Sequence, residues 1–135
     1  MKAFKLIIVF FISLHNINAQ KNIKDKLLEI AIIDEKVMMP MRDGIRLSTD
    51  IYRPKNNKKA PIIFSRTPYN FNTWQNEKEE FRTMERAYEA IKHGYAYVVQ
   101  NERGRYFSEG EWDILGIPLT DGYDAFSWLK SQSWS

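Results

Sequence analysis

One stretch in the first half of the chain alternates hydrophobic with polar residues, which is the period of a half-buried strand. Residues 45–53 show this alternation most clearly, with one face formed by Ile45, Leu47, Thr49 and Ile51. The preceding residues 35–42 are separated from them by Asp43-Gly44, a dipeptide typical of a two-residue hairpin turn. The pattern therefore predicts an antiparallel hairpin over residues 35–53.

Two later runs are apolar at consecutive positions, as in strands that are covered on both faces of a parallel sheet. The first is Ile62–Phe64 within residues 61–66, and the second covers residues 95–99. Pro68 ends the first run, because proline has no N–H to donate to a neighbouring strand. Residues 76–93 lie between the runs and carry apolar side chains at helical spacing: Phe81, Met84, Ala87, Tyr88 and Ile91.

A second helix is predicted near the end of the sequence, with Thr120 or Asp121 as its cap. Its inner face is expected to consist of Tyr123, Phe126 and Leu129, with Ala125 beside them. The order is then an antiparallel hairpin that leads into alternating parallel βα units. This order predicts an α/β fold that corresponds to the first half of a doubly wound sheet. Because the sheet is incomplete, we expect the chain to be the amino-terminal part of a longer protein.

The first 19 residues have the pattern of a secretory signal peptide. Lys2 and Lys5 precede an apolar run over residues 6–14, and Ala19 ends the cleavage site. The run is shorter than an ordinary membrane-spanning helix, so no stable membrane anchor is expected. We expect cleavage after Ala19 and a secreted or periplasmic location. Residues 20–34 are interpreted as a mobile leader in which a short helix could extend through Ile33, and residues 35–135 as the folded part.

Charge and cysteine content restrict the chemistry further. The net charge of +3 falls to +1 when Lys2 and Lys5 leave with the signal peptide, so no nucleic-acid partner is expected. The sequence has no cysteine, which excludes disulfides, cysteine nucleophiles and cysteine metal sites. No other metal-ligand spacing occurs, and we expect neither a metal nor a cofactor.

Several residues that could be catalytic have simpler explanations. Ser108 precedes Gly110, but the Gly-x-Ser-x-Gly turn of a serine nucleophile needs glycine at 106, where Tyr106 stands. His93 lies before Gly94 at the end of a predicted helix, where a capping role is expected. Asp121 and Asp124 are expected to be a cap and a surface residue. No nucleophile, general acid or general base is therefore assigned within this chain.

Tyr69 is the strongest candidate for a functional side chain. It follows the predicted strand 61–66 in the turn Arg66–Tyr69, and the loop after the third strand supplies an oxyanion donor in α/β enzymes that transfer acyl groups. A phenol O–H can donate to an oxyanion as it forms in the transition state. Alternatively, Tyr69 is a turn aromatic that packs on the following helix. The residues alone leave both roles open.

Several motifs occur together and in a recognisable order. They are Met39–Leu47, Ile51–Pro54, Arg66–Tyr69, Gly94–Ala96, Arg103–Arg105 with Ser108–Gly110, and Asp121–Asp124 with Trp128-Leu129. Over about residues 37–135 they resemble the cocaine esterase, α-amino acid ester hydrolase and Xaa-Pro dipeptidyl-peptidase family of α/β-hydrolases. The resemblance implies the amino-terminal half of an α/β-hydrolase fold.

The same resemblance implies a secreted serine hydrolase that cleaves ester or amide bonds of a small acyl ester or peptide, Xaa-Pro peptides included. In the family, a tyrosine at the position of Tyr69 donates to the oxyanion beside a backbone N–H. The nucleophilic serine, aspartate and histidine come later in the family, beyond Ser135, so the chain alone is expected to be inactive. Asn70 and Phe71 do not match the acid that follows the tyrosine in the α-amino-selective branch.

A second class of function is also open. Trp74 and Trp112 lie in predicted loops and could form a stacking surface for a glycan or another ligand. In that case the chain would be a short secreted binding or scaffold protein without catalysis.

Overall fold

The computed structural model of the chain describes residues 22–56, 59–71, 77–115 and 118–135. Its elements are α1 (Ile23–Ile30), β1 (Ala31–Pro40), β2 (Arg46–Pro54), β3 (Ile62–Thr67), α2 (Glu77–Lys92), β4 (Ala96–Asn101) and α3 (Leu119–Lys130). None of these described helices is long and apolar enough to cross a membrane. The predicted signal peptide lies outside the described residues.

The described strands form one mixed sheet in the order β1-β2-β4-β3. β1 pairs with β2 and β2 with β4 in antiparallel fashion, whereas β3 and β4 are parallel, from Ile62 opposite Ala96 to Thr67 opposite Asn101. The predicted antiparallel hairpin and the following parallel βα unit are therefore confirmed. The turn is longer than the predicted two residues, because Pro40 pairs with Arg46 and the N–H of Met41 donates to the carbonyl oxygen of Ile45 at 2.8 Å.

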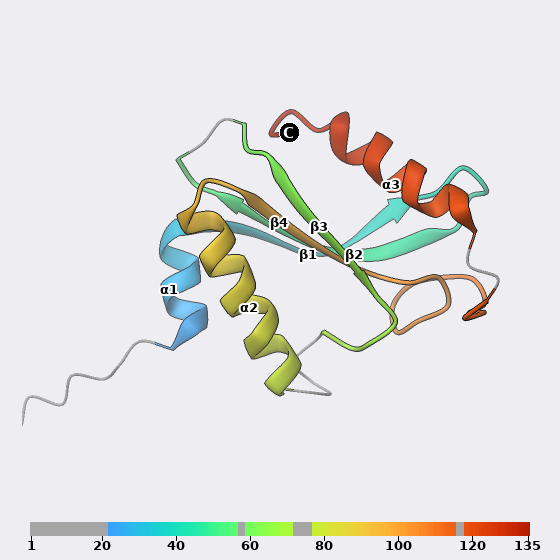
Figure 1. Cartoon of the computed structure of the whole chain (residues 1–135), viewed down its shortest axis with the longest axis horizontal. Coiled ribbons are helices and arrows are strands. Elements are labelled where there is room, and N and C mark those ends of the chain that lie inside the picture. The colour runs from blue at the N-terminus through green and yellow to red at the C-terminus, as the bar shows by residue number, and fades with distance from the viewer. Residues whose placement is uncertain (1–21, 57–58, 72–76, 116–117) are drawn as a thin grey trace, which may run out of the picture.

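Helices cover both faces of the sheet, with α1 and α2 on one face and α3 on the other (Figure 1). Leu27, Tyr52, Ala87 and Tyr97 belong to the core on the α1 and α2 side. Leu47, Val98 and Leu129 belong to a second core beneath α3. Each of the central strands β2 and β4 contributes to both cores, because successive side chains of a strand point to opposite faces.

The structure differs from the predicted leader at residues 20–34. Asn22 caps α1 by accepting a hydrogen bond from the backbone N–H of Asp25 at 2.9 Å, and Leu27 is fully buried. β1 begins at Ala31 and not at residue 35. The leader interpretation missed that Ile23, Leu27 and Ile30 share one helical face, which packs on the core beside α2.

β3 is less covered than its apolar sequence predicted. Ile63 is 42% exposed, and the other residues of the strand are half-buried. Within the described sheet β3 is an edge strand, with β4 as its hydrogen-bonded neighbour. The prediction of complete burial was therefore wrong for this strand and right for β4, all of whose residues are buried.

The inner face of α3 also differs from the prediction. The N-cap is Pro118, whose side chain makes no capping hydrogen bond, and the helix begins at Leu119, before Thr120 and Asp121. Asp121, Ala125 and Leu129 form the buried stripe, at the four-residue spacing of one helical face. Tyr123 and Phe126, predicted to face inward, are 69% and 58% exposed.

Candidate active site at the carboxyl ends of β3 and β4

Tyr69 lies where the two parallel strands end. β3 and β4 finish side by side at Thr67 and Asn101, and the loops that follow them leave from the same edge of the sheet (Figure 1). This edge is where open α/β sheets place their binding and catalytic groups. The side chain of Tyr69 extends away from the protein, with 72% of the residue exposed. The alternative in which Tyr69 packs against the following helix does not fit this exposure.

The backbone of the Tyr69 turn, in contrast, is firmly held. The side-chain amide of Asn101 donates to the carbonyl oxygen of Tyr69 at 3.0 Å, and Nε of Arg105 donates to the carbonyl oxygen of Pro68 at 3.0 Å. The backbone N–H of Tyr69 donates to Oγ1 of Thr67 at 3.1 Å. The phenol is thus open to a ligand while its backbone is fixed.

Ser108 is engaged in supporting this arrangement. Its hydroxyl donates to the backbone carbonyl of Asn101 at 3.0 Å and accepts from the backbone N–H of Ser48 at 2.9 Å. The residue is buried. Ser108 therefore joins the loop after β4 to β2, and its hydroxyl is not presented to a substrate.

Asp121 belongs to a buried ion pair, a role that the sequence did not reveal. Its carboxylate accepts two hydrogen bonds from the guanidinium of Arg103, at 2.6 and 3.1 Å, and the residue is 1% exposed. Arg103 also pairs with Asp43 in the β1–β2 turn at 2.8 Å. The Asp121 carboxylate raises the pKa of Arg103 above its ordinary value, and Arg103 lowers the pKa of Asp43.

Asp124 was expected at the surface, and the structure places it in a pair between α3 and the β1–β2 turn. It accepts hydrogen bonds from the backbone N–H of Arg42 and from its guanidinium, at 2.7 to 3.1 Å. These bonds lower the pKa of Asp124. Asp121 and Asp124 thus have separate arginine partners and do not form an acid pair.

A further arginine links the sheet to α3 beneath the site. Arg66, the residue before Thr67 on β3, donates to Oε1 of Gln100 at 2.8 and 3.0 Å and to the carbonyl oxygen of Asp121 at 2.8 Å. Burial lowers the pKa of Arg66. Gln100 is fully buried on β4 and extends the hydrogen-bond network to β2 by donating to Oγ1 of Thr49 at 2.9 Å.

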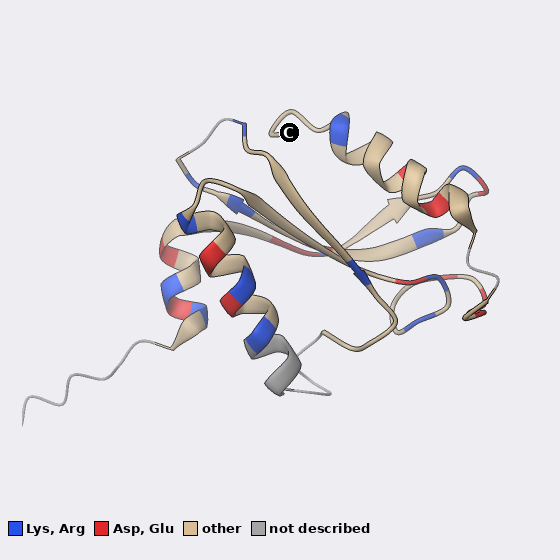
Figure 2. Cartoon of the chain, in the orientation of Figure 1, with Lys and Arg blue, Asp and Glu red and all other residues tan. Residues whose placement is uncertain are grey.

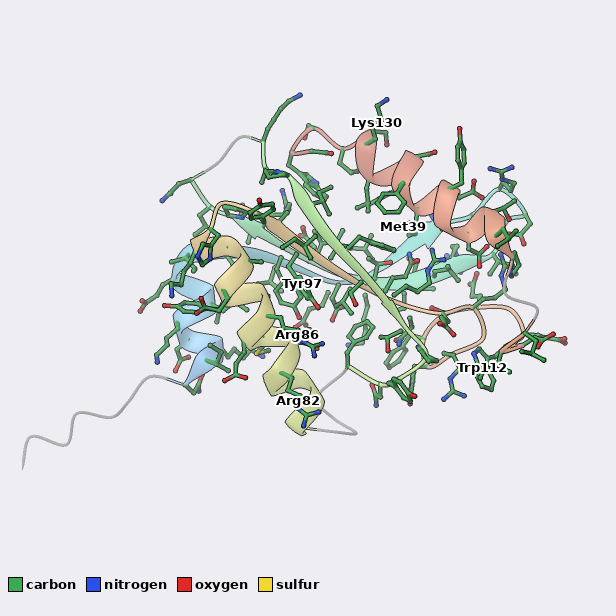
Figure 3. All side chains as sticks on the ribbon, viewed as in Figure 1. Met39, Arg82, Arg86, Tyr97, Trp112 and Lys130 are labelled. Carbon is green, nitrogen blue, oxygen red and sulfur yellow. The ribbon has the colours of Figure 1, made fainter. Side chains whose placement is uncertain are left out.

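The loop after β4 carries Arg105 between two aromatic rings. The guanidinium lies 4.7 Å from the ring centre of Trp112 and 5.2 Å from that of Tyr106. Trp112, seen in this loop in Figure 3, also donates from its indole to Glu102 at 3.1 Å. The Trp112 ring thus contacts Arg105 and Glu102 within its own loop. Trp74, the other tryptophan of the predicted stacking surface, lies outside the described residues.

Two pockets that differ in size and in lining residues open at the two ends of the β3–β4 pair. Near the Tyr69 turn is a pocket of about 260 Å³ whose lining includes Tyr69, Asn70, Thr83 and Arg86. At the opposite end is a pocket of about 630 Å³, with Ile63, Ala90, His93, Tyr95 and Tyr97 in its lining.

His93 is far along the sheet from Tyr69. It follows α2, before β4 begins, and its Nδ1 lies 2.8 Å from the carbonyl oxygen of Glu89. This contact confirms the predicted role at the helix end. The part of the chain that the structure describes thus brings no serine, histidine and aspartate together at Tyr69. Within that same part, no three His, Asp or Glu side chains are grouped as metal ligands.

Comparison with known proteins agrees with the resemblance inferred from the motifs. A family model described as "X-Pro dipeptidyl-peptidase (S15 family)" matches residues 43–135, more than half of the chain. Cocaine esterase from Rhodococcus sp. (strain MB1 Bresler) is 35% identical over 103 residues, which make up 76% of this chain and 17% of that protein.

Solved structures give the same result. An α-amino acid ester hydrolase is similar with a TM-score of 0.59 and 33% identity, over 73% of this chain and 18% of that chain. An aminopeptidase from a marine sediment archaeon, Thaumarchaeota archaeon, has a TM-score of 0.59 and 31% identity, over 78% of this chain and 20% of its own. The described sheet and helices therefore match part of the α/β fold of these hydrolases. The chain spans about a fifth of their length.

Proposed function

Because this chain belongs to the X-Pro dipeptidyl-peptidase (S15) family, we propose that it forms the oxyanion-binding part of a serine hydrolase. The observation that supports this most strongly is the placement of Tyr69. Its backbone is held by Asn101, Arg105 and Thr67, while its phenol is exposed at the carboxyl end of a parallel strand. A donor of this kind is pre-organised, so little reorganisation is needed when charge develops on the substrate.

In the proposed reaction a serine attacks the carbonyl carbon of an ester or amide, and the carbonyl oxygen becomes an oxyanion. The phenol O–H of Tyr69 and a backbone N–H donate hydrogen bonds to that oxygen. The serine, histidine and aspartate are proposed to come from a part of the hydrolase beyond Ser135. The described residues do not supply such a triad, and the chain corresponds to 17–20% of its relatives.

The proposed substrates are small acyl esters or peptides. The names of the relatives include an esterase, an amino acid ester hydrolase and an aminopeptidase, all of which cleave an acyl bond. Both ester and amide cleavage pass through the same type of tetrahedral intermediate, so one oxyanion donor serves either reaction. The proposed reaction is therefore acyl transfer, from either an ester or an amide.

Export is part of the same proposal. The charged start, apolar run and Ala19 of residues 1–19 support removal of a signal peptide and a secreted or periplasmic location. Amino-terminal sequencing of the protein recovered outside the cytoplasm should begin at Gln20. Recovery of an uncleaved chain from the cytoplasm would contradict export.

Replacing Tyr69 by phenylalanine in the full-length hydrolase tests the oxyanion role. Tyr69→Phe removes one hydroxyl and keeps the ring, so kcat is expected to fall by about 10²–10³, the loss measured for one oxyanion donor elsewhere. Tyr95→Phe is the matched control, since Tyr95 is a partly exposed tyrosine at the other end of the β3–β4 pair. A normal kcat for Tyr69→Phe would contradict the proposal, and so would an equal loss in both variants.

A further inference from the structure

We propose that Asn101 and Arg105 are positioning residues that aim Tyr69 at the reacting carbonyl. This inference rests on the proposed oxyanion role of Tyr69. The two side chains do not contact the phenol in this structure. They bond to the carbonyl oxygens of Pro68 and Tyr69, which belong to the peptide groups before and after the Cα of Tyr69, and so fix the direction in which the Tyr69 side chain leaves the turn.

The side chain of Asn101 has one orientation that satisfies its surroundings. Its Nδ2 donates to the carbonyl oxygen of Tyr69 at 3.0 Å and approaches that of Thr67 at 3.4 Å. Turning the amide over would place Oδ1 against both carbonyl oxygens, so the donors must face the turn. Asn101 is fully buried, and Oδ1 accepts no hydrogen bond from a described residue. The described contacts of the Asn101 amide are therefore those of its N–H donors with the Tyr69 turn.

Asn101 is itself held in place from below. The hydroxyl of Ser108 bonds its carbonyl oxygen, and the backbone N–H of Ser48 on β2 bonds that hydroxyl. A continuous chain of hydrogen bonds thus runs from β2 through Ser108 to the backbone of Asn101, whose side chain then contacts the turn. Such a chain gives the turn the rigidity of the sheet.

Arg105, in the loop after β4, bonds to the second carbonyl oxygen, that of Pro68. The rings of Tyr106 and Trp112 lie near its guanidinium, which restricts the rotamers of a side chain that is otherwise mobile. Tyr106 has a backbone φ of 51°, a left-handed conformation that is strained for a residue with a Cβ. Strain of this kind persists where the surrounding structure requires it, and here it accompanies the contact between Arg105 and the turn.

Rigid placement matters because an oxyanion donor acts over a narrow range of distance. A donor must lie about 2.7–3.1 Å from the position of the oxyanion, and a displacement of about 1 Å can cost on the order of 10² in rate. Tyr69 reaches outward with an exposed side chain, so its direction depends on the backbone from which it leaves. Loss of either carbonyl contact is expected to misdirect the phenol without removing it.

A double-mutant cycle in the full-length hydrolase tests this inference. Arg105→Met keeps an apolar stem between the rings and removes the donor to Pro68, and kcat is expected to fall about tenfold with little change in KM. In the Tyr69→Phe background the same change should cause no further loss, since it acts through the missing hydroxyl. Asn101→Ala should behave in the same way, and its thermal unfolding is recorded because the residue is buried.

Arg42→Met is the matched control. Like Arg105, Arg42 lies near an aromatic ring, 5.4 Å from that of Tyr123, but its guanidinium bonds to the carboxylate of Asp124 and not to the Tyr69 turn. Its kcat should stay at the wild-type value. Hydrogen exchange of the peptide that covers residues 66–71 should rise in Arg105→Met and remain unchanged in Arg42→Met.

The outcomes separate this inference from the proposed function. A normal kcat in Tyr69→Phe alone overturns the oxyanion role and this inference with it. A slow Tyr69→Phe, combined with a full rate in Arg105→Met, overturns only the positioning role. Equal losses for Arg105→Met in the wild-type and Tyr69→Phe backgrounds also overturn it, because the arginine would then act independently of Tyr69.

Discussion

The two ends of the β3–β4 pair are held by different kinds of interaction. At the carboxyl end, side chains of Arg66, Asn101, Arg103 and Arg105 bond to backbone oxygens and carboxylates of neighbouring loops. At the amino end of the pair, the hydrogen bonds between described residues are mainly between backbone groups, such as Ala96 N–H to the carbonyl oxygen of Pro61 at 2.8 Å. Figure 2 shows charges of both signs in the loops beyond the carboxyl end.

The difference follows from what each end must do. The amino end joins α2 to β4 by a short turn, and backbone hydrogen bonds with apolar packing are sufficient to hold it. The carboxyl end holds two longer loops and leaves the phenol of Tyr69 exposed, and its loops are held by polar side chains in place of an apolar cover. Buried polar groups are stable only when they are hydrogen-bonded, which makes the network at this end specific in geometry.

The largest expected difference in stability is between the ion pairs of the two ends. Asp121→Ala leaves the guanidinium of Arg103 with its exposed partner Asp43, so the loss should approach but not exceed about 3–5 kcal/mol, the cost of leaving a buried charge unpaired. Glu89→Ala removes the exposed pair with Lys92 near the amino end and should cost less than about 1 kcal/mol. Urea unfolding of the two full-length variants measures both values. Equal losses in the two variants would show that the Asp121–Arg103 pair contributes no more to stability than the exposed Glu89–Lys92 pair.

A smaller difference is expected for glycine. Gly104 has φ +68°, and a Cβ there would lie 2.3 Å from the backbone nitrogen of Trp112, so Gly104→Ala must displace the loop. Gly44 has φ +86° but nothing within 4 Å of a Cβ, so Gly44→Ala is expected to cost only left-handed strain, about 1–2 kcal/mol. Thermal unfolding should rank Gly104→Ala clearly below Gly44→Ala. The reverse order would contradict the crowding in this loop.

The smallest expected effect concerns acid. Hydrogen bonds from Arg46 lower the pKa of Glu109, so its contribution to stability is present above the unfolded pKa, about 4.3. That contribution is lost as the pH falls through the lower folded value. Glu109→Gln should therefore show a smaller loss of urea midpoint between pH 5 and pH 3 than wild type. Glu85→Gln, an exposed change on α2, is the control and should follow the wild-type curve. If the Glu109→Gln curve also coincided with the wild-type curve, the stabilising pair of Glu109 with Arg46 would be contradicted.

The sequence predicted the elements whose local pattern is strong. The hairpin around Asp43-Gly44, the buried strand β4 and the helix α2 follow from alternation, apolar runs and helical spacing. The position of Tyr69 just after a parallel strand was predicted for a similar reason, because a proline after an apolar run indicates where such a strand ends. Local signals of this kind do not require knowledge of distant partners.

The supporting residues could not be predicted because their partners are remote in the sequence. Arg105 bonds to Pro68, 37 residues away, and Asn101 bonds to Tyr69, 32 residues away. An aspartate at position 121 looks like a helix cap until the structure brings Arg103 against it. Tyr123 and Phe126 were placed inward because they share a helical face with Leu129, whereas the structure buries Asp121 and Ala125 beside Leu129.

The central claim is that Tyr69 binds the oxyanion, and a transition-state analogue tests it most directly. A boronic acid forms a tetrahedral adduct with a catalytic serine, and one of its oxygens takes the oxyanion position. In the full-length hydrolase, Tyr69→Phe should weaken inhibition by about 10²–10³, with little change in the affinity for substrate. Equal inhibition of wild type and Tyr69→Phe would contradict the account, because the phenol would then make no bond to that oxygen.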